Sequence, residues 1–407
     1  MKIVIIGAGP AGVSVVETLR EHDQQADLVV LSAEPYPPYS PPAMADHFIT
    51  GSQAHLWRGE NWPEQMGVEY RMGTRVSEVD PQAHQVRLAD GGRLGYDRLV
   101  IATGSRLYAP LDGVDLPGVY NFKSLSAAIE LIRQVKSGQA RSALIVGAGF
   151  IGMEIALLLS DLGVAVTQIE MLDQVMANML DLYTAAIALK MMRQRGVQVH
   201  LNTRALAFTG NGRANGVQLE SGETLQADLF IAATGVKPTL DFLEGSGIRH
   251  NWGIQVDDHL RTNDHHIYAA GDVIESPYRM NGEVRVHAIF PNAVEQGRVV
   301  GLNLAGYDVP YQGADRMNSL KHLGLPVMAV GMKIGDEVLQ TRRQDDLRTL
   351  YLKENRLVGF QLVGDISSAG ILRALMNQQS DLANIKDRLL DPNFGQGMLA
   401  WRALVPV

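Results

Sequence analysis

Two glycine clusters in the sequence have residue types and a spacing that can bind a phosphate group. The first glycine of such a cluster allows a tight turn, the second lets the backbone approach a pyrophosphate, and the third lets the following helix pack closely on a strand. The N–H groups at the start of that helix then present partial positive charge to the phosphates. The first cluster consists of Gly7, Gly9, Pro10, Ala11 and Gly12, and the second of Gly147, Gly149, Phe150, Ile151 and Gly152.

The elements that must position these clusters occur twice in the same order. A short apolar run precedes each cluster, at 3–6 and again at 143–146, and a helical pattern and a further apolar run follow it. Each copy closes with an apolar strand that ends in Ala-Thr-Gly. These endings are Ala102, Thr103 and Gly104 in the first copy and a segment that ends at Gly235 in the second. The repetition predicts two related dinucleotide-binding folds rather than an array of short repeats.

A carboxylate that follows the second strand of each copy could hold the hydroxyl groups of a ribose. Glu170 comes directly after that strand in the second copy, roughly twenty residues beyond Gly147. A carboxylate there favours the free 2′-hydroxyl of NAD and repels a 2′-phosphate, so we expect NAD(H) rather than NADP(H). In the first copy the candidate is Glu34, which lies somewhat farther from its cluster, with Ala33 where the acid is usual. The alternative for Glu34 is a solvated loop residue.

Composition excludes several classes of protein. The sequence has 407 residues, which predicts two or three domains. Its net charge of −8 argues against nucleic-acid binding, which usually needs a basic face. It contains no cysteine, so this chain forms no disulfide, thiol nucleophile or cysteine-ligated iron–sulfur cluster. We also expect no metal site, because no pair of histidines has a metal-binding spacing on a convincing helix.

The start of the sequence and the length of its apolar runs indicate where in the cell the protein is expected. A strand-like run begins at Ile3, without a charged leader and a cleavage site before it. No run approaches the roughly 18 apolar residues that a membrane helix needs. We therefore expect a cytoplasmic protein without stable membrane insertion.

With both glycine clusters and both Ala-Thr-Gly strands, the sequence resembles the pyridine nucleotide-disulfide oxidoreductase superfamily over about residues 1–310. It is most similar to reductases related to rubredoxin and ferredoxin reductases and to nitrite reductase flavin domains. The resemblance implies an α/β fold with two Rossmann-like FAD/NAD(P)-binding domains, the second inserted in the first, and a small C-terminal α+β interface domain. The expected boundaries are 1–110 and 236–308 for the FAD domain, 111–235 for the NAD domain and 309–407 for the C-terminal domain.

The resemblance also assigns roles to residues outside the glycine clusters. Gly271 and Asp272 end a strand whose aspartate lies on the flavin ribityl chain in the family. Ala293 and Gln296 belong to a helix that approaches the flavin ring. Glu154 follows the second cluster, where family members keep a glutamate near the nicotinamide and the flavin. The alternative for Glu154 is a partner of the helix dipole.

The loop after Glu34 departs from the family pattern. Pro42 stands where thiol-dependent members carry a redox cysteine, and Pro41 and Asp46 stand where ferredoxin reductases carry an arginine and a lysine. This chain therefore lies outside both patterns. The loop either covers the flavin, which would place Pro42 in the cofactor site, or is a proline-stiffened surface loop.

The C-terminal hundred residues carry a different pattern. Two alternating runs joined by Glu354 and Asn355 predict a hairpin, and 371–376 predicts a helix. In the family such a domain packs near the flavin or forms a dimer, so a homo-oligomer is an open alternative. The apolar segment 393–407 either packs on its own domain or docks on a partner.

These features together predict an FAD-containing NAD(H):acceptor oxidoreductase. Hydride would pass between NAD(H) and FAD, and electrons between FAD and an iron–sulfur protein or subunit. The chain resembles the flavin subunits of phenylglyoxylate dehydrogenase and of tungsten aldehyde oxidoreductase complexes. The alternatives are a free-standing rubredoxin or ferredoxin reductase or NADH oxidase, and a non-catalytic nucleotide-sensing scaffold.

Overall fold

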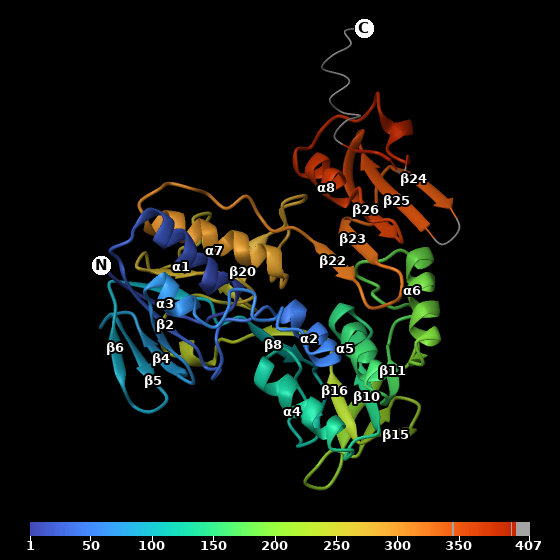
Figure 1. Cartoon of the computed structure of the whole chain (residues 1–407), viewed down its shortest axis with the longest axis horizontal. Coiled ribbons are helices and arrows are strands. Elements are labelled where there is room, and N and C mark those ends of the chain that lie inside the picture. Colours follow the sequence, from blue (N-terminus) through green and yellow to red (C-terminus); the bar gives the residue numbers. More distant parts are fainter. Residues whose placement is uncertain (344–345, 392, 396–407) are drawn as a thin grey trace. The chain divides into compact units, whose positions relative to one another are not determined.

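The computed structural model describes residues 1–343, 346–391 and 393–395 (Figure 1). Two compact units alternate along the chain. The first consists of Met1–Pro110, Val119–Ala140 and Thr234–Asp315, and the second of Leu111–Gly118, Arg141–Ala233 and the described residues from Arg316 on. Residues 119–140 thus lie in the first unit, and the C-terminal residues share a unit with the second glycine cluster. The expected functional boundaries stay a prediction.

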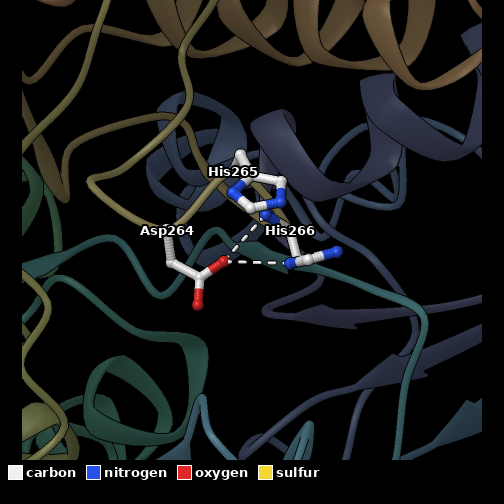
Figure 2. A group of neighbouring side chains, drawn as sticks. All are labelled: Asp264, His265 and His266. Atoms are coloured by element: carbon white, nitrogen blue, oxygen red, sulfur yellow. Dashed lines mark hydrogen bonds and ion pairs between the residues drawn. The ribbon is translucent and has the colours of Figure 1, made fainter.

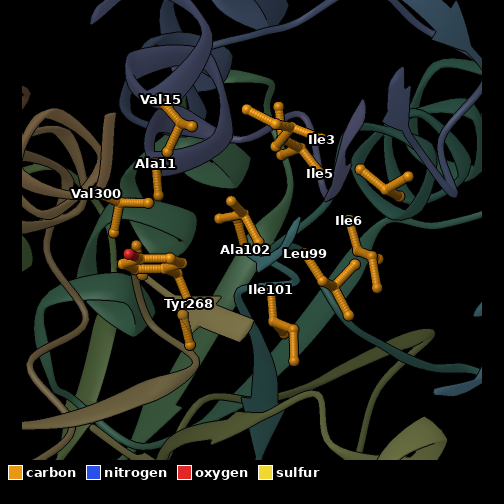
Figure 3. Close-up of a cluster of buried hydrophobic side chains, with 14 of the residues drawn as sticks. Ile3, Ile5, Ile6, Ala11, Val15, Leu99, Ile101, Ala102, Tyr268 and Val300 are labelled. Atoms are coloured by element: carbon orange, nitrogen blue, oxygen red, sulfur yellow. The ribbon is translucent and has the colours of Figure 1, made fainter. Parts of the chain in front are cut away.

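A parallel five-stranded sheet forms the centre of the first unit, in the order β19-β7-β1-β2-β3. Except for the polar edge strand β3, its strands are largely continuous apolar runs, as expected where helices or loops cover both faces. Figure 3 shows the buried side chains of this core, including Ile5, Ile101 and Tyr268. The strands are β1 (Lys2–Ile6), β2 (Asp27–Leu31), β3 (Glu69–Arg71), β7 (Arg98–Ile101) and β19 (Ile267–Ala269).

Helices α1 (Pro10–His22) and α7 (Phe290–Leu304) run side by side in the first unit because glycines let their backbones approach (Figure 1). A Cβ placed on Gly297 would lie 2.3 Å from the carbonyl oxygen of Ala11, and one on Gly301 would lie 2.7 Å from Cβ of Thr18. The Ser14 hydroxyl adds a 2.8 Å hydrogen bond to the carbonyl oxygen of Val294. The start of α1 is therefore held from two sides, by β1 and by α7.

Smaller elements complete the first unit. One small antiparallel sheet has the order β4-β5-β6, β8 pairs with β17, and a third sheet has the order β18-β20-β21. These elements are η1 (Pro41–Ala43), α2 (Met44–Thr50), α3 (Trp62–Met66), β4 (Val76–Asp80), β5 (Gln85–Leu88), β6 (Arg93–Gly95), β8 (Ser105–Tyr108), β9 (Val119–Tyr120), α4 (Leu125–Lys136), β17 (Gly235–Pro238), η2 (Asp241–Leu243), β18 (Ile254–Gln255), β20 (Ile274–Pro277) and β21 (Val284–Arg285).

The second unit repeats the parallel arrangement, with the order β12-β11-β10-β16. An antiparallel sheet with the order β13-β14-β15 follows in sequence. These elements are β10 (Ser142–Val146), α5 (Phe150–Asp161), β11 (Ala165–Ile169), α6 (Leu182–Gln194), β12 (Gln198–His200), β13 (Ala205–Thr209), β14 (Gly216–Leu219), β15 (Thr224–Gln226) and β16 (Leu229–Ala232). The two Rossmann-like folds expected from the repeated motifs are thus present.

The C-terminal residues form an antiparallel sheet in the order β22-β23-β26-β25-β24. The hairpin expected at Glu354 and Asn355 is confirmed: both residues have left-handed φ angles, 48° and 60°, and they join β25 to β26. Left-handed residues at both centres match the turn to the twist of the strands. The elements are β22 (Met317–Leu320), β23 (Val327–Gly331), β24 (Glu337–Arg343), β25 (Asp346–Lys353), β26 (Arg356–Val363), α8 (Ala369–Asn377) and η3 (Lys386–Arg388).

Two further expectations concern the C-terminal segment 393–407 and membrane-spanning helices. Most of 393–407, whose packing or docking was left open, lies outside the described residues. In the part of the chain that the structure describes, no helix has the length and apolar character to cross a bilayer.

We expect the substitution Gly297→Ala to lower the free energy of unfolding by about 1–3 kcal/mol, because the added methyl group must displace α1 from α7. Urea denaturation measures the change. Gly370→Ala in α8 is the control: its Cβ meets open space among the described residues, so it should be neutral or slightly stabilising. Equal stability of the two variants would contradict the account of helix packing.

Candidate functional site

The first glycine turn has the geometry of a phosphate-binding cradle. Gly7 has a φ of +109°, and a Cβ there would lie 2.2 Å from the carbonyl oxygen of Ala102. A Cβ on Gly12 would lie 2.1 Å from the carbonyl oxygen of Gly7, so only glycine lets α1 begin this close to β1. At Gly9, by contrast, no described atom lies within 4 Å of a Cβ. The turn therefore leaves open space at the start of α1, where a pyrophosphate fits.

The second glycine turn is a close structural copy of the first. Gly147 has a φ of +104°, and a Cβ on Gly152 would lie 2.3 Å from the carbonyl oxygen of Gly147. Gly9 and Gly149 each immediately precede a helix, with φ and ψ of −76° and −175° at Gly9 and −76° and −179° at Gly149. Phe150 and Ile151 begin α5, as Pro10 and Ala11 begin α1. Each unit therefore offers one dinucleotide cradle.

The carboxylates beside the two turns are not equivalent. In the strand register Ile6 pairs with Leu31, and Val146 pairs with Ile169. Ser32 therefore occupies in the first unit the place that Glu170 occupies in the second. The Glu170 carboxylate borders its glycine turn, because Oε2 accepts a 2.7 Å hydrogen bond from the N–H of Ala148. A ribose that binds at this turn would find Glu170 within reach.

Glu34 lies two residues beyond Ser32 and contacts another helix. Its Oε2 accepts hydrogen bonds from the Tyr39 hydroxyl at 2.8 Å and from the N–H of Leu125, at the start of α4, at 2.9 Å. Burial, together with the negative charge of Glu34, raises the pKa of Tyr39. In this structure Glu34 links the loop that contains Tyr39 to the start of α4 through hydrogen bonds. A ribose-binding role for Glu34 stays a prediction.

Asp272 is held by two donors that the sequence patterns did not identify. Its Oδ2 accepts a 2.8 Å hydrogen bond from the Ser105 hydroxyl and lies 2.6 Å from Nζ of Lys123. The side chains of Lys123 and Asp272 are only 19% and 16% exposed. Ser105 directly follows the Ala-Thr-Gly strand and could have been suspected from that position. Lys123 belongs to no motif, so no sequence signal singled it out.

The residues around Gly271 form a buried polar link to α7. Gly271 has a φ of +86°, and its N–H donates a 2.7 Å hydrogen bond to Oε1 of Gln296. Nε2 of Gln296 in turn donates to the Tyr311 hydroxyl at 3.1 Å. Ala293 is buried, and its Cβ lies 3.8 Å from a Cβ placed on Gly271. Gln296 therefore fixes the turn that presents Asp272.

The remaining candidates are distributed over both units. Gly104 has a φ of +66° after β7, and Thr103 donates a 3.1 Å hydrogen bond to the carbonyl oxygen of Thr239. Pro42 lies in η1, and Gly235 begins β17. In the second unit, Glu154 is half-buried on α5 among apolar residues.

We expect Glu34→Ala to lower the free energy of unfolding by about 1–2 kcal/mol, because the first turn of α4 and Tyr39 both lose an acceptor. The loss should appear in cofactor-free protein, measured by urea denaturation. The control is Glu60→Ala, which changes an exposed residue of the same unit. If Glu34→Ala were as stable as this control, the stabilising role of these hydrogen bonds would be contradicted.

Comparison with known proteins identifies the family of this chain. The profile of the pyridine nucleotide-disulphide oxidoreductase family matches residues 1–297. The chain is 28% identical over 402 residues to the NADH-dependent phenylglyoxylate dehydrogenase subunit epsilon of Aromatoleum evansii, covering 96% of this chain and 94% of that one. It is 30% identical over 373 residues to a rubredoxin-NAD(+) reductase of Pseudomonas putida, covering 89% and 96%.

A solved structure has a similar fold. The NAD-dependent persulfide reductase from A. fulgidus superposes with a TM-score of 0.87 at 26% identity, covering 95% of this chain and 79% of that one. The two parallel sheets, the two glycine turns and the family match support one conclusion. The chain belongs to the pyridine nucleotide-disulphide oxidoreductase family and is an oxidoreductase that uses FAD and NAD(H).

Proposed function

We propose that this chain is the NAD(H)-linked flavin subunit of a larger oxidoreductase and passes electrons between its FAD and an iron–sulfur partner. The observation that carries the proposal is the nearly end-to-end match to the phenylglyoxylate dehydrogenase subunit, which covers 96% of this chain and 94% of the relative. Other relatives are a rubredoxin-NAD(+) reductase and a dioxygenase ferredoxin–NAD(+) reductase component. Rubredoxin and ferredoxin are iron–sulfur carriers, which favours that class of partner.

The first unit would hold FAD. FAD supplies a group that exchanges a hydride with NAD(H) and exchanges electrons with a carrier. The open space at Gly9 and the start of α1 would take its pyrophosphate. Asp272 would bind the ribityl chain, and Ser105 and Lys123 restrict the orientation of its carboxylate. Gly271 and Gln296 keep that turn in place.

The second unit would hold NAD(H). Gly149 and the start of α5 would take the pyrophosphate, and Glu170 would accept hydrogen bonds from the ribose hydroxyls. The charge of Glu170 disfavours a 2′-phosphate. Glu154 would lie toward the nicotinamide, where its negative charge would orient the ring and the water around it.

The absence of cysteine supports transfer to a separate carrier. The resemblance implies that thiol-dependent members of the family carry a redox cysteine at the position of Pro42. This sequence has no cysteine at any position. No thiol of this chain can therefore receive electrons from the flavin. A free-standing rubredoxin reductase is the second candidate, favoured by the 30% identity to the Pseudomonas putida enzyme.

We expect Glu170→Ala to raise the Kd for NADH about tenfold or more, because the ribose loses hydrogen bonds to a charged acceptor worth about 1.5–3 kcal/mol. The Kd for NADPH should change less, since repulsion of the 2′-phosphate is removed at the same time. Titration of FAD-loaded protein measures both values. Glu220→Ala, an exposed position of the same unit, is the control. An unchanged Kd for NADH in Glu170→Ala would overturn the assignment.

Purification from the native host at native expression tests the subunit proposal. We expect the chain to co-purify with iron–sulfur subunits in a defined stoichiometry. A chain that is isolated alone and rapidly reduces free rubredoxin or ferredoxin with NADH would contradict the proposal and support the free-standing reductase. Brisk consumption of oxygen without a partner would contradict it in favour of an NADH oxidase.

A further inference from the structure

Three histidines gather in the first unit at the end of the sheet opposite its glycine turn. His265 and His266 directly precede β19, whereas Gly271 follows that strand. Because β19 is parallel to β7 and β1, the histidines lie at the amino ends of the strands and the glycine turn at the carboxyl ends. His84, in the turn between β4 and β5, completes the group. The group is therefore separate from the FAD cradle.

The three imidazole rings lie close together. The ring centroids of His265 and His266 are 4.1 Å apart, and those of His84 and His266 are 4.6 Å apart. Tyr96 stacks on the ring of His84 at 5.6 Å and restricts its rotation. A surface pocket of about 400 Å³ is lined by this group together with Asp264, Asn263 and Ser246.

Asp264 orients one of these rings. Its Oδ1 accepts a 2.8 Å hydrogen bond from the backbone N–H of His266 and lies 3.3 Å from Nδ1 of the same residue (Figure 2). Nδ1 of His266 and Oδ1 of Asp264 thus face each other and are placed to bind the same ion.

The spacing of the donor atoms suits a single small ion. Asp264, His265 and His266 each offer one donor atom, and these atoms lie within 4.8 Å of one another. Zinc–nitrogen bonds of about 2.0–2.1 Å keep two ligands of one ion within roughly 4 Å of each other. The 3.3 Å between Oδ1 of Asp264 and Nδ1 of His266 lies within this limit.

We propose that Asp264, His265, His266 and His84 form a binding site for a divalent transition-metal ion, with Zn²⁺ as the ion that fits best. Imidazole nitrogen is a preferred ligand of zinc, nickel and copper, whereas magnesium and calcium prefer oxygen ligands. The carboxylate of Asp264 disfavours an anion. A bound ion would join the β4–β5 turn to the segment before β19.

A group of one histidine and several carboxylates in the same unit provides a control. Nδ1 of His259 lies 2.6 Å from Asp258, and Nε2 lies 2.8 Å from Asp308. The hydrogen bond from His259 to Asp258 raises the pKa of the imidazole. Asp257, Asp258 and His259 also offer donor atoms within 4.8 Å of one another, but this group gives a transition-metal ion one imidazole rather than two.

Calorimetric titration of the full, FAD-loaded chain with ZnCl₂ tests the proposal, after chelator treatment and removal of any polyhistidine tag. We expect one ion per chain and a higher Tm in its presence. The double variant His265→Ala/His266→Ala should lose binding. Asp264→Asn should weaken it about tenfold or more, because the ion loses a charged oxygen ligand. His259→Ala should bind as the natural chain does.

The controls separate a built site from nonspecific binding. MgCl₂ should give no comparable heat or Tm shift. The proposal is overturned if His265→Ala/His266→Ala binds Zn²⁺ with unchanged stoichiometry and affinity, or if His259→Ala abolishes binding. Circular dichroism shows whether the double variant is folded, and His84→Ala gives an independent variant in a different element. The readout is metal binding, so its result does not depend on the proposed electron-transfer partner.

Discussion

The approach of each helix to its preceding strand, at Gly12 and Gly152, is the constraint on which the rest of this structure depends. A Cβ at either position would lie within 2.3 Å of the carbonyl oxygen of Gly7 or Gly147. Larger residues would push the helix away from the strand and turn its N-terminal N–H groups away from the cradle. In the first unit the constraint extends to α7, because Gly297 meets α1 one residue before Gly12. The same close contacts at glycine therefore determine both the phosphate site and the helix packing.

The two units have glycine turns of the same geometry, but different residues lie beside each turn. The second has a carboxylate directly after its second strand, and Glu170 contacts the glycine turn. The first has Ser32 in that place, while Glu34 accepts a hydrogen bond from the start of α4 and Asp272 is held by Ser105 and Lys123. This difference is consistent with two different dinucleotides, NAD(H) in the second unit and FAD in the first. The residues that hold Asp272 come from segments far apart in sequence.

The sequence allowed prediction of features that are encoded locally. The glycine turns, the apolar strands and the hairpin at Glu354 and Asn355 follow from short patterns and turn chemistry. The contacts between Lys123 and Asp272, and between Glu34 and Leu125, could not be predicted because they join distant segments that share no motif. The contact between His84 and His266 could not be predicted for the same reason, because these residues meet only after the sheet has formed.

The central claim is that this chain carries hydride between NAD(H) and FAD, with NADH preferred because of Glu170. Anaerobic stopped-flow mixing of the FAD-loaded chain with NADH, followed at the flavin absorbance, tests it most directly. The account predicts rapid bleaching with NADH and much slower bleaching with the same concentration of NADPH. Bleaching that is equally fast with NADPH would contradict the role of Glu170, and a flavin that neither nucleotide reduces would contradict the claim itself.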